Sequence, residues 1–227
     1  MGRYSMVKTA YHDMEKLFGS LKSKKAGLFV NHTAVHQYSY IWEILKNQNI
    51  NVSAIFSPEH GLFGVEQDQI SVDNETYHNI PIVSLYGKDE KSLFPEDAKL
   101  NNLDIILFDI QDVGTRYYTY INSMIYFMQR LHKKDIEFLV IDRPNPLNGL
   151  QFEGPVLKEE FASFVGVLPV PVRHGLTCGE CALFAQKHFG LDMQLTVLTM
   201  KNWKRKMYFE ETGLQWFAPS PNMPTIE

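Results

Sequence analysis

The sequence alternates between short runs of β-branched and aromatic residues and longer amphipathic stretches, and this alternation constrains the fold more than any other feature. It is typical of a parallel sheet covered by helices. The runs predict strands at Ala26–Val30, Val52–Ser57, Ile82–Leu85, Ile105–Ile110, Phe138–Asp142, Val170–Arg173 and Leu195–Thr199. Helices are predicted between them at His36–Asn47, Tyr118–Lys133 and Gly179–Phe189. The predicted fold class is α/β, with a Rossmann-like open, mostly parallel sheet and helices on both faces.

The second predicted helix has the clearest periodicity. Its apolar side chains recur at helical spacing, at Ile121, Met124, Ile125, Met128 and Leu131. One face of this helix should therefore lie in the core.

The chain of 227 residues shows no internal repeat, no low-complexity tract and no Gly/Ser-rich or Pro-rich linker. A single domain over residues 1–227 is therefore expected. The segment Trp216–Pro224 is rich in aromatic and turn residues, and it resembles an interrupted loop more than a natural terminus. We therefore expect the native protein to continue beyond Glu227.

The charge balance argues against nucleic acid as a partner. The 22 Lys and Arg residues face 26 Asp and Glu residues, for a formal net charge of −4. No apolar run approaches the roughly 18 residues of a bilayer span, and residues 1–18 do not resemble a signal peptide. The cysteines, Cys178 and Cys181, are too few for a disulfide scaffold. We expect a cytoplasmic chain without membrane insertion, although an export signal already removed would leave the same sequence.

Ligands in open α/β sheets bind beyond the carboxyl ends of the strands, so the segments after the predicted strands are the first place to search. Four of them are rich in polar residues: Ser57–Gly64 with Glu59 and His60, Asp109–Tyr118, Asp142–Gly149 and Arg173–Thr177. We expect these loops to meet at one rim. Their mixture of Glu, Asp, Arg, His, Asn and Tyr with few Lys suits a neutral or anionic polyhydroxyl ligand.

Each of these residues also has a structural interpretation. Asp109 or Asp142 can cap the next helix, Arg116 and Arg143 can pair with them, and a lone His60 is more often structural than catalytic. It is the combination of four such loops at one edge that favours a functional site.

Several other chemistries do not fit the sequence. No G-x-G-x-x-G motif follows a predicted strand, no phosphate-binding loop is complete at Gly87-Lys88, and no G-x-S-x-G motif is present. The pair Cys178 and Cys181 supplies half of a zinc site, so we interpret that segment as a helix start, with Thr177 as N-cap and Glu180 as its reciprocal partner. Asp109 and Asp112 form an incomplete ligand set for a divalent ion. We predict no metal and no cofactor.

The ordered motifs resemble those of the NamZ-type exo-β-N-acetylmuramidases, formerly a family of unknown function. The resemblance extends from about Gly27 to Thr225 and lies in Ser57–Gly64 (SPEHGLFG), Ser84–Gly87 (SLYG), Phe108–Tyr120 (FDIQDVGTRYYTY), Asp142–Leu147 (DRPNPL), Glu153–Pro155, Phe164–Gly166, Pro171–Thr177 (PVRHGLT) with Gly179-Glu180, and Pro219–Thr225 (PSPNMPT). It implies a Rossmann-like N-terminal domain and an enzyme that removes N-acetylmuramic acid from the non-reducing end of peptidoglycan fragments. It also implies a smaller C-terminal domain as partner, which would make this chain a truncated N-terminal domain whose own activity is open.

The residues suggest roles for such an enzyme. Glycoside hydrolysis needs an acid to protonate the leaving oxygen and usually a second carboxylate. Glu59 is the predicted acid, with His60 beside it; Asp112 and Asp109 are candidates for the second group, unless the 2-acetamido group of the substrate replaces it. The predicted substrate contacts are Arg116, Arg143 and Arg173 for the lactyl carboxylate, and Tyr117, Tyr118, Asn145 and His174 for the sugar.

Two other functions remain compatible with the same rim. One is a non-catalytic module that binds a carbohydrate or a protein partner. The other is a metal-dependent phosphohydrolase that uses Asp109 and Asp112.

Overall fold

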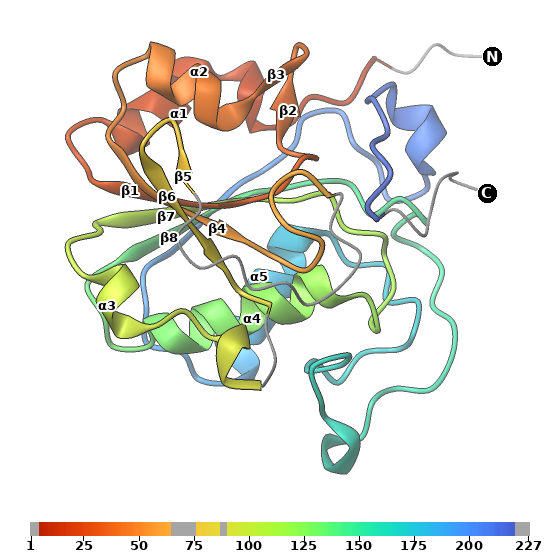
Figure 1. Cartoon of the computed structure of the whole chain (residues 1–227). Coiled ribbons are helices and arrows are strands. Elements are labelled where there is room, and N and C mark those ends of the chain that lie inside the picture. Colours follow the sequence, from red (N-terminus) through yellow and green to blue (C-terminus); the bar gives the residue numbers. More distant parts are fainter. Residues whose placement is uncertain (1–4, 65–75, 87–89, 221–227) are drawn as a thin grey trace.

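The computed structural model describes residues 5–64, 76–86 and 90–220, and it has a seven-stranded sheet at its centre (Figure 1). The strand order is β5-β6-β4-β1-β7-β8-β9, and every neighbouring pair except β5 and β6 is parallel. The strands span β1 Ala26–Val30, β4 Val52–Ser57, β5 Thr76–Tyr77, β6 Ile80–Ser84, β7 Ile105–Asp109, β8 Glu137–Ile141 and β9 Leu195–Leu198. The predicted α/β class with a mostly parallel sheet is confirmed.

Helices cover both faces of the sheet (Figure 1). One face carries α1 (Met14–Leu21) and α2 (Ile41–Asn47), and the other carries α3 (Asp97–Leu100), α4 (Thr119–Leu131) and α5 (Cys178–His188). A small hairpin of β2 and β3 precedes α2, and four 3₁₀ helices complete the described elements: β2 Val35–His36, β3 Ser39–Tyr40, η1 Ala10–His12, η2 Glu90–Leu93, η3 Glu159–Phe161 and η4 Phe209–Thr212.

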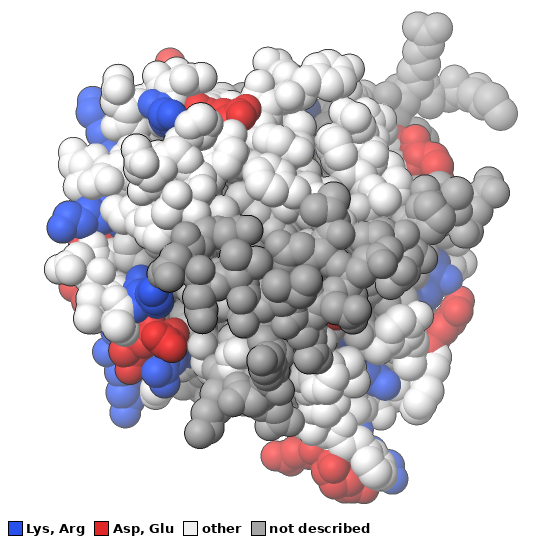
Figure 2. All heavy atoms as spheres, viewed as in Figure 1, with Lys and Arg blue, Asp and Glu red and all other residues white. Residues whose placement is uncertain are grey.

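The molecular face in Figure 2 carries acidic and basic side chains intermingled around its edge. Acidic side chains gather at the end of the long segment that carries η3, which begins with Glu159 and Glu160. Within the described ranges, no helix combines the length and the apolar character that a bilayer span requires.

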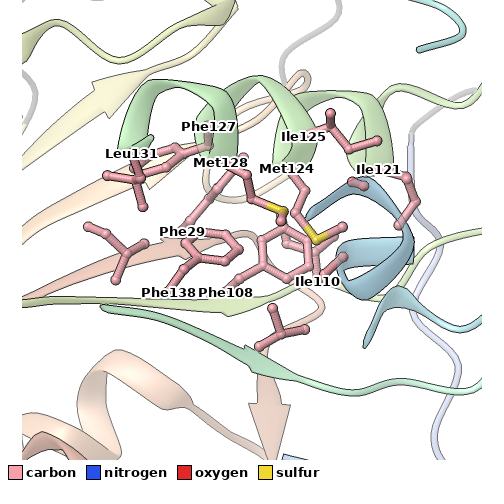
Figure 3. Close-up of a cluster of buried hydrophobic side chains, with 14 of the residues drawn as sticks. Phe29, Phe108, Ile110, Ile121, Met124, Ile125, Phe127, Met128, Leu131 and Phe138 are labelled. Carbon is pink, nitrogen blue, oxygen red and sulfur yellow. The ribbon is translucent and has the colours of Figure 1, made fainter. Parts of the chain in front are cut away.

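The core between α4 and the sheet follows the predicted periodicity (Figure 3). The apolar residues predicted to face the core, Ile121, Met124, Ile125, Met128 and Leu131, are all buried. They pack over the aromatic rings of Phe29, Phe108 and Phe138 on the central strands. Phe29 and Phe108 meet edge to face, with ring centroids 5.2 Å apart. Apolar residues lie on both faces of these strands, so each strand appears in the sequence as a continuous hydrophobic run.

The predicted strand Val170–Arg173 is wrong. In this segment the described structure has only isolated bridges at Arg173, to Thr115 and to Glu153. The physical reason is proline: Pro169 and Pro171 lack the backbone N–H groups that a strand inside a sheet must donate.

The predicted helix His36–Asn47 begins later, at Ile41, because the β2–β3 hairpin uses the preceding residues and places Gln37 and Tyr38 in left-handed conformations. Helix α1 was not predicted, although Asp13 caps it by accepting the Lys16 N–H at 3.1 Å. The other predicted elements begin and end within two residues of those observed.

Candidate active site

The sheet places the candidate site where its strand order reverses. From β1 the chain proceeds to β4 and β6 on one side, and it then returns to β7 on the other side of β1. Ligands of open α/β sheets bind at the carboxyl ends of the strands that flank such a reversal. Here those ends lead into residues 31–33 and 110–112, which are joined because Gln111 donates its backbone N–H to the Thr33 hydroxyl at 2.9 Å.

Glu59 follows β4 in a tight turn at the same edge of the sheet. The Gly61 N–H donates to the Pro58 carbonyl at 3.1 Å, and His60 has a left-handed backbone with a φ of 70°. Thr119, the first residue of α4, donates its hydroxyl to Oε2 of Glu59 at 2.6 Å. The predicted acid therefore lies against the start of α4.

Asp109 ends β7 and is fully buried with partners on both carboxylate oxygens. Arg143 donates from Nε to Oδ1 at 2.7 Å and from Nη2 to Oδ2 at 2.9 Å, and the Tyr11 hydroxyl also donates to Oδ2. Burial alone would lower the pKa of Arg143, but the Asp109 carboxylate outweighs burial and holds that pKa above its ordinary value. The pair Asp109 and Arg143 thus forms part of the scaffold beneath the site.

Asp112 lies on the same loop in a different environment. Its side chain is 5% exposed, and Oδ2 accepts the Gly114 N–H at 2.7 Å, whereas Oδ1 has no partner among the described residues. Burial raises the pKa of Asp112 to about 7, although the N–H groups of Gly114 and Val113 oppose the shift. A buried carboxyl group with one unpartnered oxygen and a pKa near neutrality is suited to proton exchange.

Asn145 joins the loop after β8 to its neighbours. Its amide donates to the Leu176 carbonyl at 2.9 Å and accepts the Leu147 N–H at 2.9 Å. Gly114, with a φ of 86°, approaches this amide so closely that a Cβ there would lie 2.4 Å from Oδ1 of Asn145. Asn145 therefore links the loop after β8 to the segment before α5. Its contact with a sugar stays a prediction.

Arg116 and Arg173 connect the rim to the segment that follows β8. Nη1 of Arg116 donates to the carbonyls of Pro155 at 2.8 Å and Val170 at 2.6 Å. Arg173 forms an ion pair with Glu153 at 2.8 Å, and its buried Nε has no partner within the described ranges. Part of the Arg173 guanidinium therefore has no protein acceptor in the structure described.

His174 is 3% exposed, and its neighbours fix its tautomer. Nδ1 accepts the Leu176 N–H at 3.1 Å, so the proton of the neutral ring lies on Nε2. Burial lowers the pKa of His174 to about 4, and the positive charge of Arg116 contributes. The ring is therefore neutral near pH 7, and Nε2 is a donor without an acceptor among the residues described.

Tyr117 and Tyr118 differ in exposure. Tyr117 is 58% exposed, whereas Tyr118 is half-buried and packs edge to face against Tyr120, with ring centroids 4.8 Å apart. Burial raises the pKa of Tyr118 to about 12, and the charges of Asp112 and Glu59 add to the shift. Both carboxylates therefore lie within electrostatic reach of one phenol.

Sequence reasoning did not single out two further polar residues at this edge. Asn31 follows β1, is fully buried and accepts both the N–H and the hydroxyl of Thr33, at 3.0 and 2.6 Å. Gln111 donates to the Pro144 carbonyl at 2.9 Å, while its buried Oε1 has no partner in the described part of the chain. Applying the strand-end rule to the first strand as well would have identified Asn31.

A family model described as the N-terminal part of the exo-beta-N-acetylmuramidase NamZ matches residues 26–227. The chain belongs to the NamZ family. This confirms the resemblance found in the motifs, although Gly87 and residues 221–225 of those motifs lie outside the described residues.

Relatives of this NamZ-family chain are known from sequence and from structure. It is 47% identical over 213 residues to the peptidoglycan beta-N-acetylmuramidase NamZ of Bacillus subtilis (strain 168), covering 91% of this chain and 50% of that protein. Two crystal structures of DUF1343 family proteins from Bacteroides fragilis match with TM-scores of 0.86 and 0.81 and identities of 37% and 36%. They cover 97% and 98% of this chain, which spans 57% and 58% of theirs. The chain thus spans about half the length of these relatives.

The cysteines of this NamZ-family chain lie in α5 and are buried and unbridged. The predicted helix start is confirmed, because Thr177 and Glu180 form a capping box. Asp142 adds to this helix start by accepting the Gly179 N–H at 2.8 Å. Across residues 5–64, 76–86 and 90–220, no group of three or more His, Cys, Asp or Glu side chains is arranged to hold a metal ion.

Proposed function

We propose that this chain is part of a glycoside hydrolase that releases N-acetylmuramic acid from the non-reducing end of peptidoglycan fragments. The observation that carries the proposal is the 47% identity, over 91% of this chain, to a protein named peptidoglycan beta-N-acetylmuramidase. The shared half includes the loop of Glu59 and the loop of Asp112. We therefore assign the acid–base chemistry of the reaction to this half.

Glu59 is the proposed general acid. Cleavage of a glycosidic bond needs a proton on the departing oxygen, and a carboxyl group on a rigid loop at the ligand edge of the sheet can supply it. The turn of Pro58–Gly61 and the hydrogen bond from Thr119 support this role because they hold the carboxyl group in one place.

Asp112 is the proposed second carboxyl group, in preference to Asp109. Both oxygens of Asp109 accept hydrogen bonds from Arg143 and Tyr11, which leaves them occupied within the fold. Asp112 has one oxygen without a partner among the described residues. With its pKa raised by burial to about 7, it can accept a proton from the attacking group at neutral pH.

The remaining rim residues are proposed to bind the muramyl saccharide. Arg116 and Arg173 would bind the lactyl carboxylate through guanidinium N–H groups that the fold does not use, such as the Nε–H of Arg173. The Nε2–H of His174 would donate to a sugar oxygen, and the exposed ring of Tyr117 would contact the face of the sugar. Arg143 is committed to Asp109 and is not included in this set.

The substitution Glu59→Gln tests the proposal in the native protein. Gln keeps the shape of the side chain but cannot donate the acidic proton, so turnover of a peptidoglycan disaccharide should fall by roughly 10²–10⁴-fold. An aryl N-acetylmuramide with a good leaving group needs less protonation and should lose much less. Release of the sugar is measured for both substrates.

Glu96→Gln is the matched control, because it makes the same change at an exposed carboxyl group at the start of α3 and should leave both rates unchanged. Near-normal turnover of the disaccharide by Glu59→Gln would exclude Glu59 as the acid. Binding of muramyl saccharides without any sugar release by the native protein would favour the non-catalytic binding module instead.

A further inference from the structure

The hydroxyl of Thr119 contacts the proposed acid at the short distance of 2.6 Å between Oγ1 and Oε2 of Glu59. Thr119 is nearly buried and begins α4, whose apolar face is fixed against the central strands. A β-branched side chain at a helical position has few rotamers, so this hydroxyl has little freedom to move. It is a rigid hydrogen-bonding group beside a carboxyl group that must be oriented.

The hydroxyl is not used to begin the helix. The N-cap of α4 is Tyr118, which makes no side-chain capping bond, and Thr119 lies one position further into the helix. A capping threonine would accept a backbone N–H of the first turn. The hydroxyl of Thr119 instead donates sideways to Glu59, 60 residues away in the sequence.

We propose that Thr119 is a positioning residue that fixes the orientation of the Glu59 carboxyl group through Oε2. While the hydroxyl donates to Oε2, that oxygen is held against the start of α4, and the carboxyl group keeps one orientation toward the departing oxygen. The phenol of Tyr86 also contacts Glu59: burial raises the pKa of Tyr86, and the charge of Glu59 and a hydrogen bond to it add to the shift. This inference rests on the proposed role of Glu59 as the acid.

The test is Thr119→Val in the native protein, with Thr119→Ser as the conservative variant. Val keeps the shape but lacks the hydroxyl, so the carboxyl group of Glu59 can rotate and present its proton less often in the reactive direction. Turnover of the disaccharide should fall by about 10- to 100-fold, the range for a lost hydrogen bond to the carboxylate charge that develops as Glu59 gives up its proton, with little change in KM. The aryl substrate should lose less than about 3-fold, and Ser should restore most of the disaccharide rate.

A control with the same chemistry exists at the other end of the sheet. Thr196 on β9 donates its hydroxyl to Oε1 of Glu137 at 2.7 Å, and Glu137 is the first residue of β8. Thr196→Val removes an equivalent hydroxyl–carboxylate bond far from the strand carboxyl ends, and turnover should stay unchanged. Thr119→Val added to Glu59→Gln should cause no further loss, because the two groups act as a unit.

The outcomes separate this inference from the proposed function. If Glu59→Gln abolishes disaccharide turnover while Thr119→Val leaves it intact, the acid stands and the positioning role is overturned. Equal fractional losses on both substrates, or a Ser variant as impaired as the Val variant, would show a purely structural role for Thr119. If Glu59→Gln itself has no effect, the assignment of the acid fails first.

Discussion

Asp109 ends strand β7 and Asp112 lies on the loop that follows it. Both carboxyl groups are buried, but they differ in whether both of their oxygens have hydrogen-bond partners. Asp109 has Arg143 and Tyr11 on its two oxygens. Asp112 has one backbone N–H on Oδ2 and no partner on Oδ1 within the residues described. Burying an unpaired carboxyl group destabilises a fold, whereas the pairing at Asp109 compensates for burial.

The difference supports our proposal that Asp109 stabilises the fold whereas Asp112 acts in the reaction. The paired group, Asp109, lies at the end of β7 and binds Arg143 on the loop that follows β8. The unpaired group lies on the following loop and contacts Gln111, which also keeps an unpartnered buried atom in the described structure. Unsatisfied polar groups are tolerated where a ligand can satisfy them, so the contrast supports assigning Asp112 to the site.

The largest effect on stability is expected for Asp109→Asn. The amide keeps the shape but removes the negative charge, which leaves the buried guanidinium of Arg143 uncompensated. Loss of one partner of a buried ion pair costs about 3–5 kcal/mol of unfolding free energy. Urea unfolding measures the loss, and Asp97→Asn is the control because its ion pairs with Arg130 and Lys134 are exposed and should matter little. Equal losses in the two variants would break the comparison.

The opposite result is expected for Asp112→Asn. Its carboxyl pKa is about 7 in the folded protein, well above the ordinary 3.8, so the folded state holds this proton more tightly. Wild-type stability should therefore fall as pH rises from about 4 to about 7, and the Asn variant should lack this fall. At pH 8 the variant should be more stable by up to about 4 kcal/mol in urea unfolding.

The same variant should also be a poor catalyst, with turnover of the disaccharide reduced by at least about 10²-fold. Higher stability together with lost activity is the pattern expected of a functional group that strains the fold. A variant that is less stable than wild type at pH 8 would show that Asp112 supports the fold instead.

The scaffold was predictable from sequence because its signals are local. The strands β1 and β4 were predicted with their observed bounds, since buried central strands read as continuous apolar runs. The error at Val170–Arg173 came from a local signal that was overlooked, the prolines at 169 and 171.

The internal order of the site was not predictable in the same way. Asp109 and Asp112 look alike in the sequence, and what distinguishes them is contact with Tyr11, 98 residues away, and with Arg143, 34 residues away. The contact between Thr119 and Glu59 spans 60 residues and has no sequence pattern. Strand ends identify where polar groups gather, but tertiary packing decides which of them remain without partners.

The smallest and most discriminating effect on stability is expected at His174, whose pKa is lowered in the folded protein, whereas that of Asp112 is raised. The pKa of His174 is about 4 in the folded protein against an ordinary 6.5, so the unfolded chain binds this proton first as pH falls. Stability from the neutral ring is complete above about pH 6.5 and is lost as pH decreases toward 4, by about 1–3 kcal/mol.

In wild type His174 opposes both Asp112 and Asp142, whose carboxyl pKa burial raises to about 6, so stability should fall with rising pH by less than the two carboxyl groups alone would give. Removing one group should reveal the other. His174→Asn, which keeps an acceptor for the Leu176 N–H, should lose more stability than wild type as pH rises from 4 to 7, because Asp112 and Asp142 then have no opposing group. Asp112→Asn should have a nearly flat profile over the same rise, because His174 then opposes Asp142 alone. Urea unfolding of both variants between pH 4 and pH 8 measures the two slopes. If stability changes with pH equally in the two variants, Asp112 and His174 do not have pKa values shifted in opposite directions in the folded protein. The contrast between the paired and the unpaired carboxyl groups would then have to rest on Asp109 alone.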